Sequence, residues 1–550
     1  MRGLMMATPL LISSIITHAA RHHGAAEIVS RTVEGPYHHY TYRDAERRIK
    51  QLANALVALG LAPGDRVATL AWNGYRHLEL FHAISSLGAV CHTINPRLFK
   101  SQIEYIVNHA ADVLLFTDLC FAPLVAELRP KLGPLRQIVV LTDRQHMPVS
   151  DLPDALCYEE LLAEQSDRFS WPVFDEETAS ALCYTSGTTG HPKGVLYSHR
   201  STLLHAFAVL ITPGLQFGPG DVMLPVVPLF HANGWGIPYL APMVGAKLVL
   251  PGPKLDGASL YELLERERVT TTWGVPTVWF GLLQYLRDSG QRLTTLKSLV
   301  SGGSAVPPAL VRAFEETYRV EVVHGWGMTE MSPVGACSGW VPPALAAEER
   351  WRAKQKQGKP IFGVEMKIVD ADDHELPQDD VSFGELLVRG PNVARGYFAD
   401  DAATRDAFSE DGWLRTGDVA TIDPEGGVQI LDRMKDMIKS GGEWISSIEL
   451  ENAALNHRDV AEAAVIGVRH PVWSERPLLL VVPRPGAQLV GQEILAFLAG
   501  RIAKWWLPDD VVVLDQLPHT ATGKLWKADL RERFREHLVD RVKDGTGGQP

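Results

Sequence analysis

Cysteine is scarce in this chain of 550 residues, and no two cysteines form a CxxC pair. That pattern excludes a disulfide framework and a cysteine-rich zinc site. It favours a reducing compartment, so we expect a cytoplasmic protein. The five cysteines are Cys91, Cys120, Cys157, Cys183 and Cys337.

Long hydrophobic runs and an excess of positive charge are also missing. No stretch of 18 apolar residues occurs, so no transmembrane helix is expected. Lys and Arg number 53 against 65 Asp and Glu, a net charge of −12 that argues against a nucleic-acid partner. Residues 1–16 are apolar in patches but lack the regions of a signal peptide, so we expect a helix packed on the body.

What the chain does have is an alternation of strand and helix patterns over about residues 1–340. Residues 67–71 and 90–94 are typical of buried strands, and residues 76–87 between them are typical of a helix. Such alternation predicts an α/β fold with doubly wound βαβ sheets. Further strands are expected at 113–117, 138–141, 247–250 and 299–301.

The pattern changes twice towards the C-terminus. Short strands at 366–369, 385–388 and 428–431 alternate with turn clusters, which predicts a small β-barrel or meander over about 361–432. Residues 1–433 would then form the N-terminal domain, hinged to a compact α+β domain at 434–550. In that second domain we expect helices at 448–455 and 491–502 and strands at 463–467 and 478–482.

The strongest local signal is the segment YTSGTTGHPKG at 184–194, which follows an apolar run. Its hydroxyls, glycines and one lysine are suited to wrapping a polyphosphate. It is not a Walker A loop, because Gly194 stands where Ser or Thr should follow the lysine. The predicted phosphate-binding residues are Thr185, Ser186, Gly187, Thr188, Thr189, Gly190 and Lys193.

This segment resembles the signature of the adenylate-forming superfamily, which includes acyl-CoA synthetases, firefly luciferase and peptide-synthetase adenylation domains. Further motifs follow in the order of that family, so the resemblance covers nearly the whole chain. They are HGWGMTE at 324–330, GELLVRG at 384–390, GWLRTGD at 412–418, DRMKDMIKSGGE at 432–443 and PHTATGK at 518–524.

The resemblance implies ATP and Mg²⁺ as cofactors. Thr185 and Glu330 would hold the metal, since Mg²⁺ prefers hard oxygen ligands beside phosphates. Thr329 would contact the α-phosphate, and Lys524 would be the catalytic lysine that stabilises developing charge. Asp418 would bind the ribose hydroxyls with Arg433 nearby. The expected adenine site contains Gly302, Gly303 and Ser304, and Gly325, Trp326 and Met328 are further expected nucleotide-binding residues.

The resemblance also implies a second half-reaction with CoA. Lys435 matches the hinge about which the C-terminal domain rotates. The face presented for thioester formation would contain Lys439, Gly441, Gly442 and Trp444.

The acid substrate is indicated by residues 230–236, FHANGWG, which resemble the acyl-site segment of the family. They contain no carboxylate, so an amino-acid substrate is not expected. Trp235 and Gly236 would line the acyl pocket, where Gly327 replaces the tryptophan of acetate-specific relatives and so admits a longer chain. His231 is expected to position the carboxylate or to gate the tunnel; a packed structural histidine is the alternative.

The sequence therefore resembles, within the superfamily, medium-chain fatty-acid–CoA ligases and 3-methylmercaptopropionate–CoA ligases. We expect an acid–thiol ligase that converts a carboxylic acid, ATP and CoA into acyl-CoA, with a medium-chain or long-chain fatty acid as substrate. The 3-methylmercaptopropionate ligase is the alternative within the class. A luciferase-like oxygenase, a carrier-loading acyl-AMP ligase and an inactive nucleotide-binding homologue are the alternatives outside it. By analogy with long-chain relatives, a homodimer is expected, and an apolar substrate would be compatible with weak peripheral membrane contact.

Overall fold

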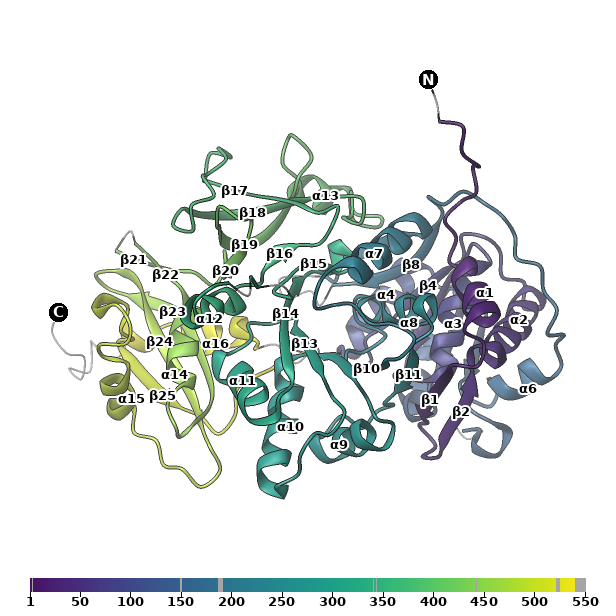
Figure 1. Ribbon diagram of the computed structural model, residues 1–550, viewed down its shortest axis with the longest axis horizontal. Helices are drawn as coiled ribbons and strands as arrows, with labels where there is room; N and C mark the ends of the chain where they lie inside the picture. Colours follow the sequence, from purple (N-terminus) through teal and green to yellow (C-terminus); the bar gives the residue numbers. More distant parts are fainter. Residues whose placement is uncertain are drawn as a thin grey trace.

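The computed structural model describes residues 1, 3–148, 151–185, 191–339, 341–342, 344–441, 443–520 and 525–539. Two large sheets form the body, a small antiparallel sheet lies above one side of it, and a fourth sheet belongs to the C-terminal part (Figure 1). This arrangement confirms the predicted α/β class. None of the described helices has the length and apolar character needed to cross a membrane.

The seven-stranded sheet has the order β7-β6-β5-β3-β4-β8-β9, and all of its pairs are parallel except β8–β9. Helices α4 (Lys100–Ala110) and α5 (Ala122–Leu128) cover its outer face, and α6 is Tyr158–Ala163. The strands are β3 (Arg66–Leu70), β4 (Val90–Thr93), β5 (Leu114–Thr117), β6 (Gln137–Val140), β7 (Leu156–Cys157), β8 (Ala179–Tyr184) and β9 (Gly194–Ser198).

The nine-stranded sheet has the order β16-β15-β14-β13-β12-β10-β11-β1-β2, with a parallel centre and antiparallel edges. Helices α9 (Gly257–Arg266), α10 (Pro276–Ser289) and α11 (Pro308–Arg312) pack on its outer face. The strands are β1 (Glu27–Arg31), β2 (Tyr37–Thr41), β10 (Val222–Pro225), β11 (Lys247–Leu250), β12 (Thr271–Gly274), β13 (Ser298–Gly302), β14 (Glu321–Gly327), β15 (Val334–Cys337) and β16 (Lys359–Pro360).

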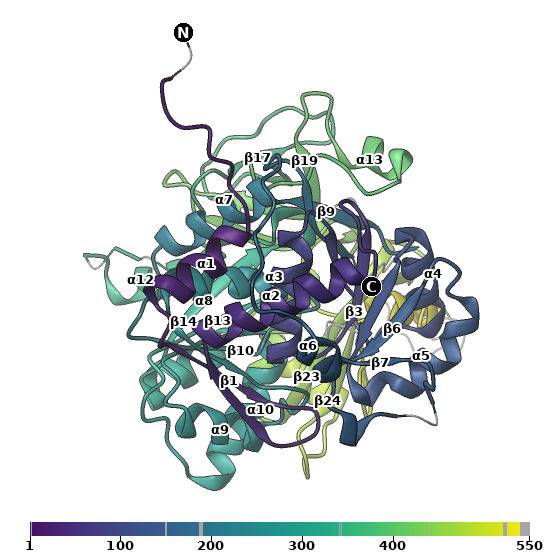
Figure 2. The ribbon, with the colours of Figure 1, turned by 90° about the vertical axis from the view of Figure 1, so that its right-hand side faces the viewer.

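The two sheets share one apolar core, filled by the helices between them (Figure 2). Helix α2 shows why this layer forms. Thr41 and Asp44 make a capping box at its start, and Ile49, Leu52 and Leu56 are fully buried on one face. The helices of this layer are α1 (Ser13–His22), α2 (Tyr42–Ala58), α3 (Tyr75–Ser86), α7 (His199–Ile211) and α8 (Ile237–Val244).

The helix expected over residues 1–16 is wrong in its extent, because α1 begins only at Ser13. Pro9 disfavours a helical residue before it. The backbone N–H of Leu10 donates to Glu176 at 2.8 Å, and that of Ile12 donates to Nδ1 of His199 at 3.1 Å. These amides are therefore satisfied by distant side chains rather than by helical hydrogen bonds.

The unit expected to be a small β-barrel or meander is an open antiparallel meander in the order β17-β18-β19-β20. In the described residues no ladder joins β17 to β20, so the meander is the alternative that the structure contains. Four strands are too few to bend round into a closed cylinder. The elements are α12 (Ala347–Gln355), β17 (Glu365–Val369), β18 (Phe383–Arg389), α13 (Asp401–Ala407), β19 (Leu414–Ile422) and β20 (Val428–Arg433).

The C-terminal part is α+β, as predicted, although the helix expected at 491–502 ends at Leu498. Its sheet contains the long antiparallel pair β23–β24, and β21 and β25 pair with the other edge of β24, at successive positions along it. The elements are β21 (Ile438–Ser440), β22 (Glu443–Ile445), α14 (Ser447–Leu455), β23 (Val460–His470), β24 (Ser474–Pro483), α15 (Gly491–Leu498), β25 (Asp510–Val513) and α16 (Lys527–Arg533).

A buried polar network ties this part to the end of β20. Asp432 accepts hydrogen bonds from the N–H of Ser447 at 2.6 Å and from its hydroxyl at 2.7 Å. Lys527 in turn donates to Ser447 and to Glu451, each at 2.6 Å. Burial alone would lower the pKa of Lys527, but these carboxylates outweigh it and raise that pKa. The Lys527 ammonium therefore stays charged, and this network connects Asp432, before the predicted hinge at Lys435, to Ser447, after it.

Asp118, which follows β5, is a buried acid that generates a test of the fold. Its carboxylate accepts the N–H of Trp72 at 2.7 Å, and burial raises its pKa to about 7. Because the folded state holds this proton more tightly than the unfolded state, stability is lost as pH rises from about 4 to about 7.

We expect Asp118→Asn to remove this loss, since asparagine can accept the same hydrogen bond without a charge. The melting temperature of the variant should exceed that of the wild type by roughly 2–4 °C at pH 8, and the difference should shrink at pH 5. Differential scanning fluorimetry across this range measures it, with the exposed Asp167→Asn as control. A difference that is constant with pH would contradict the assignment.

Candidate active site

The carboxyl ends of the two parallel sheets meet, and one buried side chain joins them. Asn73, just after β3, donates to the carbonyls of Pro225 and Val227, each at 2.8 Å. Its carbonyl accepts the N–H of Leu229, also at 2.8 Å. Ligands of open α/β sheets bind outside the carboxyl ends of the strands, so this junction is where a site is expected.

The two ends of the predicted phosphate loop are held together at this junction. Strands β8 and β9 pair antiparallel up to Tyr184 and Gly194. Beyond them, the N–H of Thr185 donates to the carbonyl of Lys193 at 2.9 Å, and the N–H of Lys193 donates to the Thr185 hydroxyl at 3.2 Å. The remaining predicted loop residues, Ser186, Gly187, Thr188, Thr189 and Gly190, lie outside the described residues.

Thr329 and Glu330 are buried beside the loop and are held by two tyrosines that the sequence analysis missed. Tyr197 donates to the carbonyl of Thr329, and Tyr397 donates to Oε1 of Glu330, each at 2.6 Å. Burial, and then the Glu330 charge, raise the pKa of Tyr397 well above its ordinary value. The only sequence signal for Tyr397 is its place at the end of a glycine-rich and proline-rich loop after β18.

The residues predicted to hold Mg²⁺ suit that ion chemically. Glu330 offers a carboxylate and Thr185 a hydroxyl, both hard oxygen donors. Thr185 and Glu330 lie on neighbouring elements. Burial, and also the charge of Glu330, raise the pKa of Cys183, which lies two residues before Thr185, so Glu330 is close to this end of β8. We therefore keep Thr185 and Glu330 as the residues that would hold the ion.

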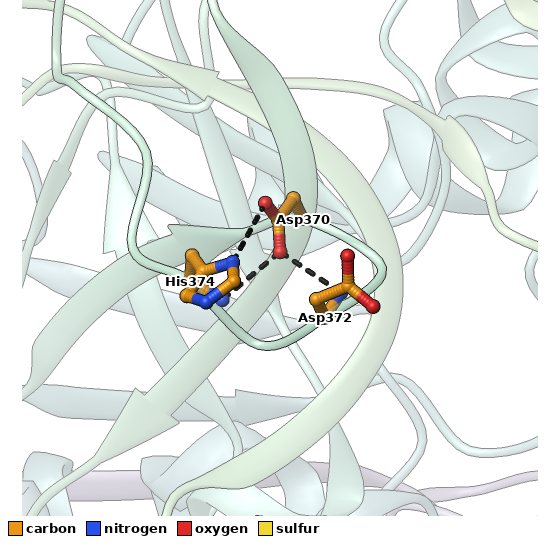
Figure 3. Close-up of side chains that lie close together, drawn as sticks. All are labelled: Asp370, Asp372 and His374. Carbon is orange, nitrogen blue, oxygen red and sulfur yellow. Dashed lines mark hydrogen bonds and ion pairs between the residues drawn. The ribbon is translucent and has the colours of Figure 1, made fainter.

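Only one compact group of three possible metal ligands is found in the described part of the chain, and it lies elsewhere. Asp370, Asp372 and His374 occupy the turn after β17 (Figure 3). One carboxylate oxygen of Asp370 accepts the N–H groups of Asp372 and His374, each at 2.9 Å. These hydrogen bonds are those of an ordinary Asx turn, so the turn geometry explains why the three side chains lie close together.

Asp418 is buried at the near end of the small sheet. Its Oδ2 accepts the indole N–H of Trp326 at 3.0 Å, and its Oδ1 pairs with Nε of Arg433 at 2.7 Å. The predicted ribose-binding pair is thus together, and Trp326, also predicted to bind the nucleotide, contacts it. Each carboxylate oxygen can accept more than one hydrogen bond, which suits Asp418 to the predicted ribose contact.

The predicted adenine and further nucleotide-binding residues lie at the carboxyl ends of β13 and β14 or just beyond them, and Gly302 pairs with Gly325. A Cβ at Gly302 would meet the carbonyl oxygen of Gly325 at 2.6 Å and the indole of Trp235 at 3.2 Å. Only glycine allows this approach. Ser304 is exposed beyond it, and the N–H of Met328 donates to the carbonyl of Pro333 at 3.0 Å.

The predicted acyl segment has an unusual backbone. Residues 232–236 all have positive φ, from +36° to +80°, although three of the five are not glycine. Non-glycine residues in this region carry strain, and such runs persist only where neighbours hold them. The Thr93 hydroxyl donates to Asn233 at 3.0 Å, and Gly236 lies against the ring of His205. The turn buries the Trp235 ring against Gly302.

His231 precedes this turn and lies close to the phosphate loop. It lines a cavity of about 10 Å³ with Thr185, Asn95 and Thr93. The space is about that of one water molecule. This position is compatible with the predicted contact to a substrate carboxylate.

Gly327 has a steric role that the sequence analysis did not foresee. A Cβ there would meet the carbonyl oxygen of Pro333 at 1.9 Å, so the β14–β15 turn itself requires glycine. Its effect on pocket length stays a prediction, and a bulky substitution would first displace the turn.

Lys524, the predicted catalytic lysine, lies outside the described residues, but its neighbours are placed. His519 and Leu525 form an isolated antiparallel bridge. The ring of Trp526 lies 6.3 Å from that of Phe99, in the loop between β4 and α4. The C-terminal part therefore contacts the body close to the site at this point.

The described residues of the predicted thioester face contact other residues of the C-terminal part. Among the described residues, Lys439 contacts Trp444 and Glu475, and Gly441 contacts Trp473. Gly442 lies outside those residues. The hinge residue Lys435 is exposed, and partial desolvation of its ammonium lowers its pKa.

Comparison with known proteins agrees with this geometry. The sequence matches the AMP-binding enzyme family over residues 16–398 and the AMP-binding enzyme C-terminal domain over residues 449–524. It is 50% identical to a 3-methylmercaptopropionyl-CoA ligase of Ruegeria lacuscaerulensis, over 98% of this chain and 100% of that protein. It is 46% identical to a medium-chain-fatty-acid–CoA ligase of Ectopseudomonas oleovorans, over 98% of each.

A solved structure shares the fold over almost the whole chain. The anthranilate CoA ligase AuaEII in complex with anthranoyl-AMP superposes with a TM-score of 0.86 at 26% identity, covering 97% of this chain and 100% of that one.

The Asp418 site generates a direct test of nucleotide binding. Asp418→Ala leaves the Trp326 N–H and the Arg433 guanidinium without their acceptor and removes the predicted ribose contact. ATP affinity, measured by calorimetry without any acid present, should fall at least about tenfold. Glu385→Gln breaks an ion pair with Arg415 in the same sheet and should leave ATP affinity unchanged. Equal affinities of Asp418→Ala and wild type would contradict the ribose assignment.

Proposed function

The chain belongs to the AMP-binding enzyme family and is an AMP-forming acyl-CoA ligase. We propose that its acid substrate is a carboxylate whose aliphatic chain is unbranched and carries no further charge. The enzyme uses ATP, Mg²⁺ and CoA. We propose a medium-chain fatty acid first. The observation that carries the proposal is the acyl segment, in which a buried Trp235 and two glycines replace any group that could pair a second charge.

The second candidate, 3-methylmercaptopropionate, is favoured by the 50% identity to the Ruegeria enzyme. This acid is a short chain of the same shape as pentanoate, with sulfur in place of one methylene. Both candidates therefore require an apolar pocket that no charged side chain lines, and they differ in the length of the pocket that they fill.

The first half-reaction follows from the residues at the junction. A carboxylate oxygen of the acid attacks the α-phosphorus of ATP, the bond to the bridging oxygen breaks, and pyrophosphate leaves. Lys193 and the loop at 185–193 would hold the departing phosphates, Asp418 the ribose, and Gly302 the adenine face. Lys524 would stabilise the charge that moves during the transfer. Bound Mg²⁺ supplies charge neutralisation between phosphate oxygens.

The second half-reaction transfers the acyl group to CoA. The thiolate sulfur attacks the acyl carbonyl of the adenylate, and the bond to the phosphate oxygen breaks to release AMP. For this step we propose rotation of residues 434–550 about Lys435, which withdraws Lys524 and brings Lys439, Gly441 and Gly442 to the acyl end. The contact of Trp526 with Phe99 supports assigning the present arrangement to the first half-reaction.

We expect a straight-chain series from C4 to C12 to separate the substrate candidates. If the pocket is apolar, each added methylene should raise kcat/KM about fourfold until the pocket is full. CoA-dependent AMP formation measures this, with malonate and benzoate as charged and aromatic controls. A maximum on either control would overturn the substrate proposal. A value for 3-methylmercaptopropionate at least tenfold above that for pentanoate would select the second candidate.

Lys524→Ala tests the division of labour between the half-reactions. It should abolish acid-dependent pyrophosphate release, while ATP binding and the conversion of chemically prepared acyl-AMP and CoA into acyl-CoA persist. The matched control is Lys504→Ala, which removes an exposed lysine of the same C-terminal part. Adenylate formation by Lys524→Ala at a near wild-type rate would show that another group performs its role.

We also propose a homodimer, by analogy with long-chain relatives, and a cytoplasmic location, from the cysteine usage. The five cysteines support the location, since all are free thiols in the structure.

A further inference from the structure

We propose that Tyr397 is a positioning residue that presents the Glu330 carboxylate to the metal–nucleotide and keeps it apart from Lys193. The inference rests on the proposed function and deepens it. Tyr397 stands between two groups of opposite charge. Its hydroxyl donates to Oε1 of Glu330 at 2.6 Å, and its ring lies 4.8 Å from the ammonium of Lys193.

The backbone around Tyr397 fixes it to both neighbours. The N–H of Ala394 donates to the carbonyl of Glu330 at 2.7 Å, and the N–H of Phe398 donates to the carbonyl of Gly194 at 2.8 Å. The N–H of Tyr397 itself donates to the Thr404 hydroxyl at 2.9 Å, at the second turn of α13. The phenol is therefore carried by a segment that is bonded to the residues on each side of it.

Tyr397 affects how the charges of Lys193 and Glu330 interact when no ligand is bound. Opposite charges in a partly buried site favour a direct ion pair, and such a pair would have to break before phosphate and cation could bind. No ion pair of Lys193 or of Glu330 is found in the described part of the chain. Instead the ammonium faces a ring and the carboxylate accepts one hydroxyl, both weaker partners than an opposite charge. Each group stays available to the nucleotide and the metal.

The hydroxyl has a second effect, on orientation. A carboxylate only accepts hydrogen bonds, so the phenol is the donor and occupies one oxygen of Glu330. Partners of this kind set the direction in which a metal-binding carboxylate points. Tyr397 thus combines a spacer, its ring, with an orienting donor, its hydroxyl, and the two parts can be removed separately.

Tyr197 provides a matched control, because its hydrogen-bond partner, Thr329, directly precedes Glu330. It donates a hydrogen bond of equal length, 2.6 Å, to the carbonyl of Thr329 and is fully buried. Tyr197→Phe removes one hydroxyl next to Glu330 without touching its carboxylate. A general loss of packing or folding would therefore affect Tyr197→Phe and Tyr397→Phe alike.

The experiment measures ATP binding by calorimetry with Mg²⁺ and with EDTA, in the absence of acid and CoA. Tyr397→Phe should weaken binding in Mg²⁺ roughly tenfold and leave binding in EDTA unchanged, because only the orientation of Glu330 is lost. Tyr397→Leu removes the spacer as well, so Lys193 and Glu330 can pair and binding should weaken under both conditions. Tyr197→Phe should keep the wild-type ratio between the two conditions.

The outcomes separate this inference from the function on which it rests. A wild type that does not bind ATP would overturn the proposed function itself. A wild type that binds ATP more tightly with Mg²⁺, together with an unchanged ratio in Tyr397→Phe, would overturn only the role of Tyr397. An equal fall in Tyr197→Phe would do the same, since it would show that any lost hydroxyl suffices.

Discussion

The convergence of two parallel sheets at their carboxyl ends is the constraint on which the rest of the structure depends. Each sheet alone ends in loops with unpaired backbone groups, and the three hydrogen bonds of Asn73 satisfy such groups on the opposite sheet. The shared helical layer sets the distance between the sheets. Among the described residues, those assigned to ATP or to the acid lie at this junction or on elements that pack against it.

Polar groups are buried at this junction, and their partners come from distant parts of the chain. Asp418 of the small sheet meets Trp326 of the large sheet, and Glu330 meets Tyr397 from the loop before α13. Burying a carboxylate is costly unless donors are placed to receive it. The fold places donors against both carboxylates, which is how a stable core and charged groups suited to ligands coexist.

The accuracy of the sequence analysis varied with the range of the interactions involved. Strand β11 was predicted to the residue, and β3, β4 and β20 to within two, because a buried strand shows itself in a short apolar run. The helix over residues 1–16 failed because Glu176 and His199, far away in the chain, take its amides. The sequence left a barrel and a meander both open for the small sheet, because closure depends on whether β17 and β20 can meet, which no local pattern encodes.

The sequence by itself determined the fold class, the order of the motifs, the family and the chemistry that the phosphate loop and Asp418 are suited to perform. Those properties depend on residue types at fixed spacings along the chain. Only the tertiary structure decided that Gly327 is demanded by the carbonyl of Pro333, and that Tyr397 stands between Lys193 and Glu330. Contacts between residues some 60 or 200 positions apart depend on how the sheets and loops pack, and packing is a property of the whole folded chain.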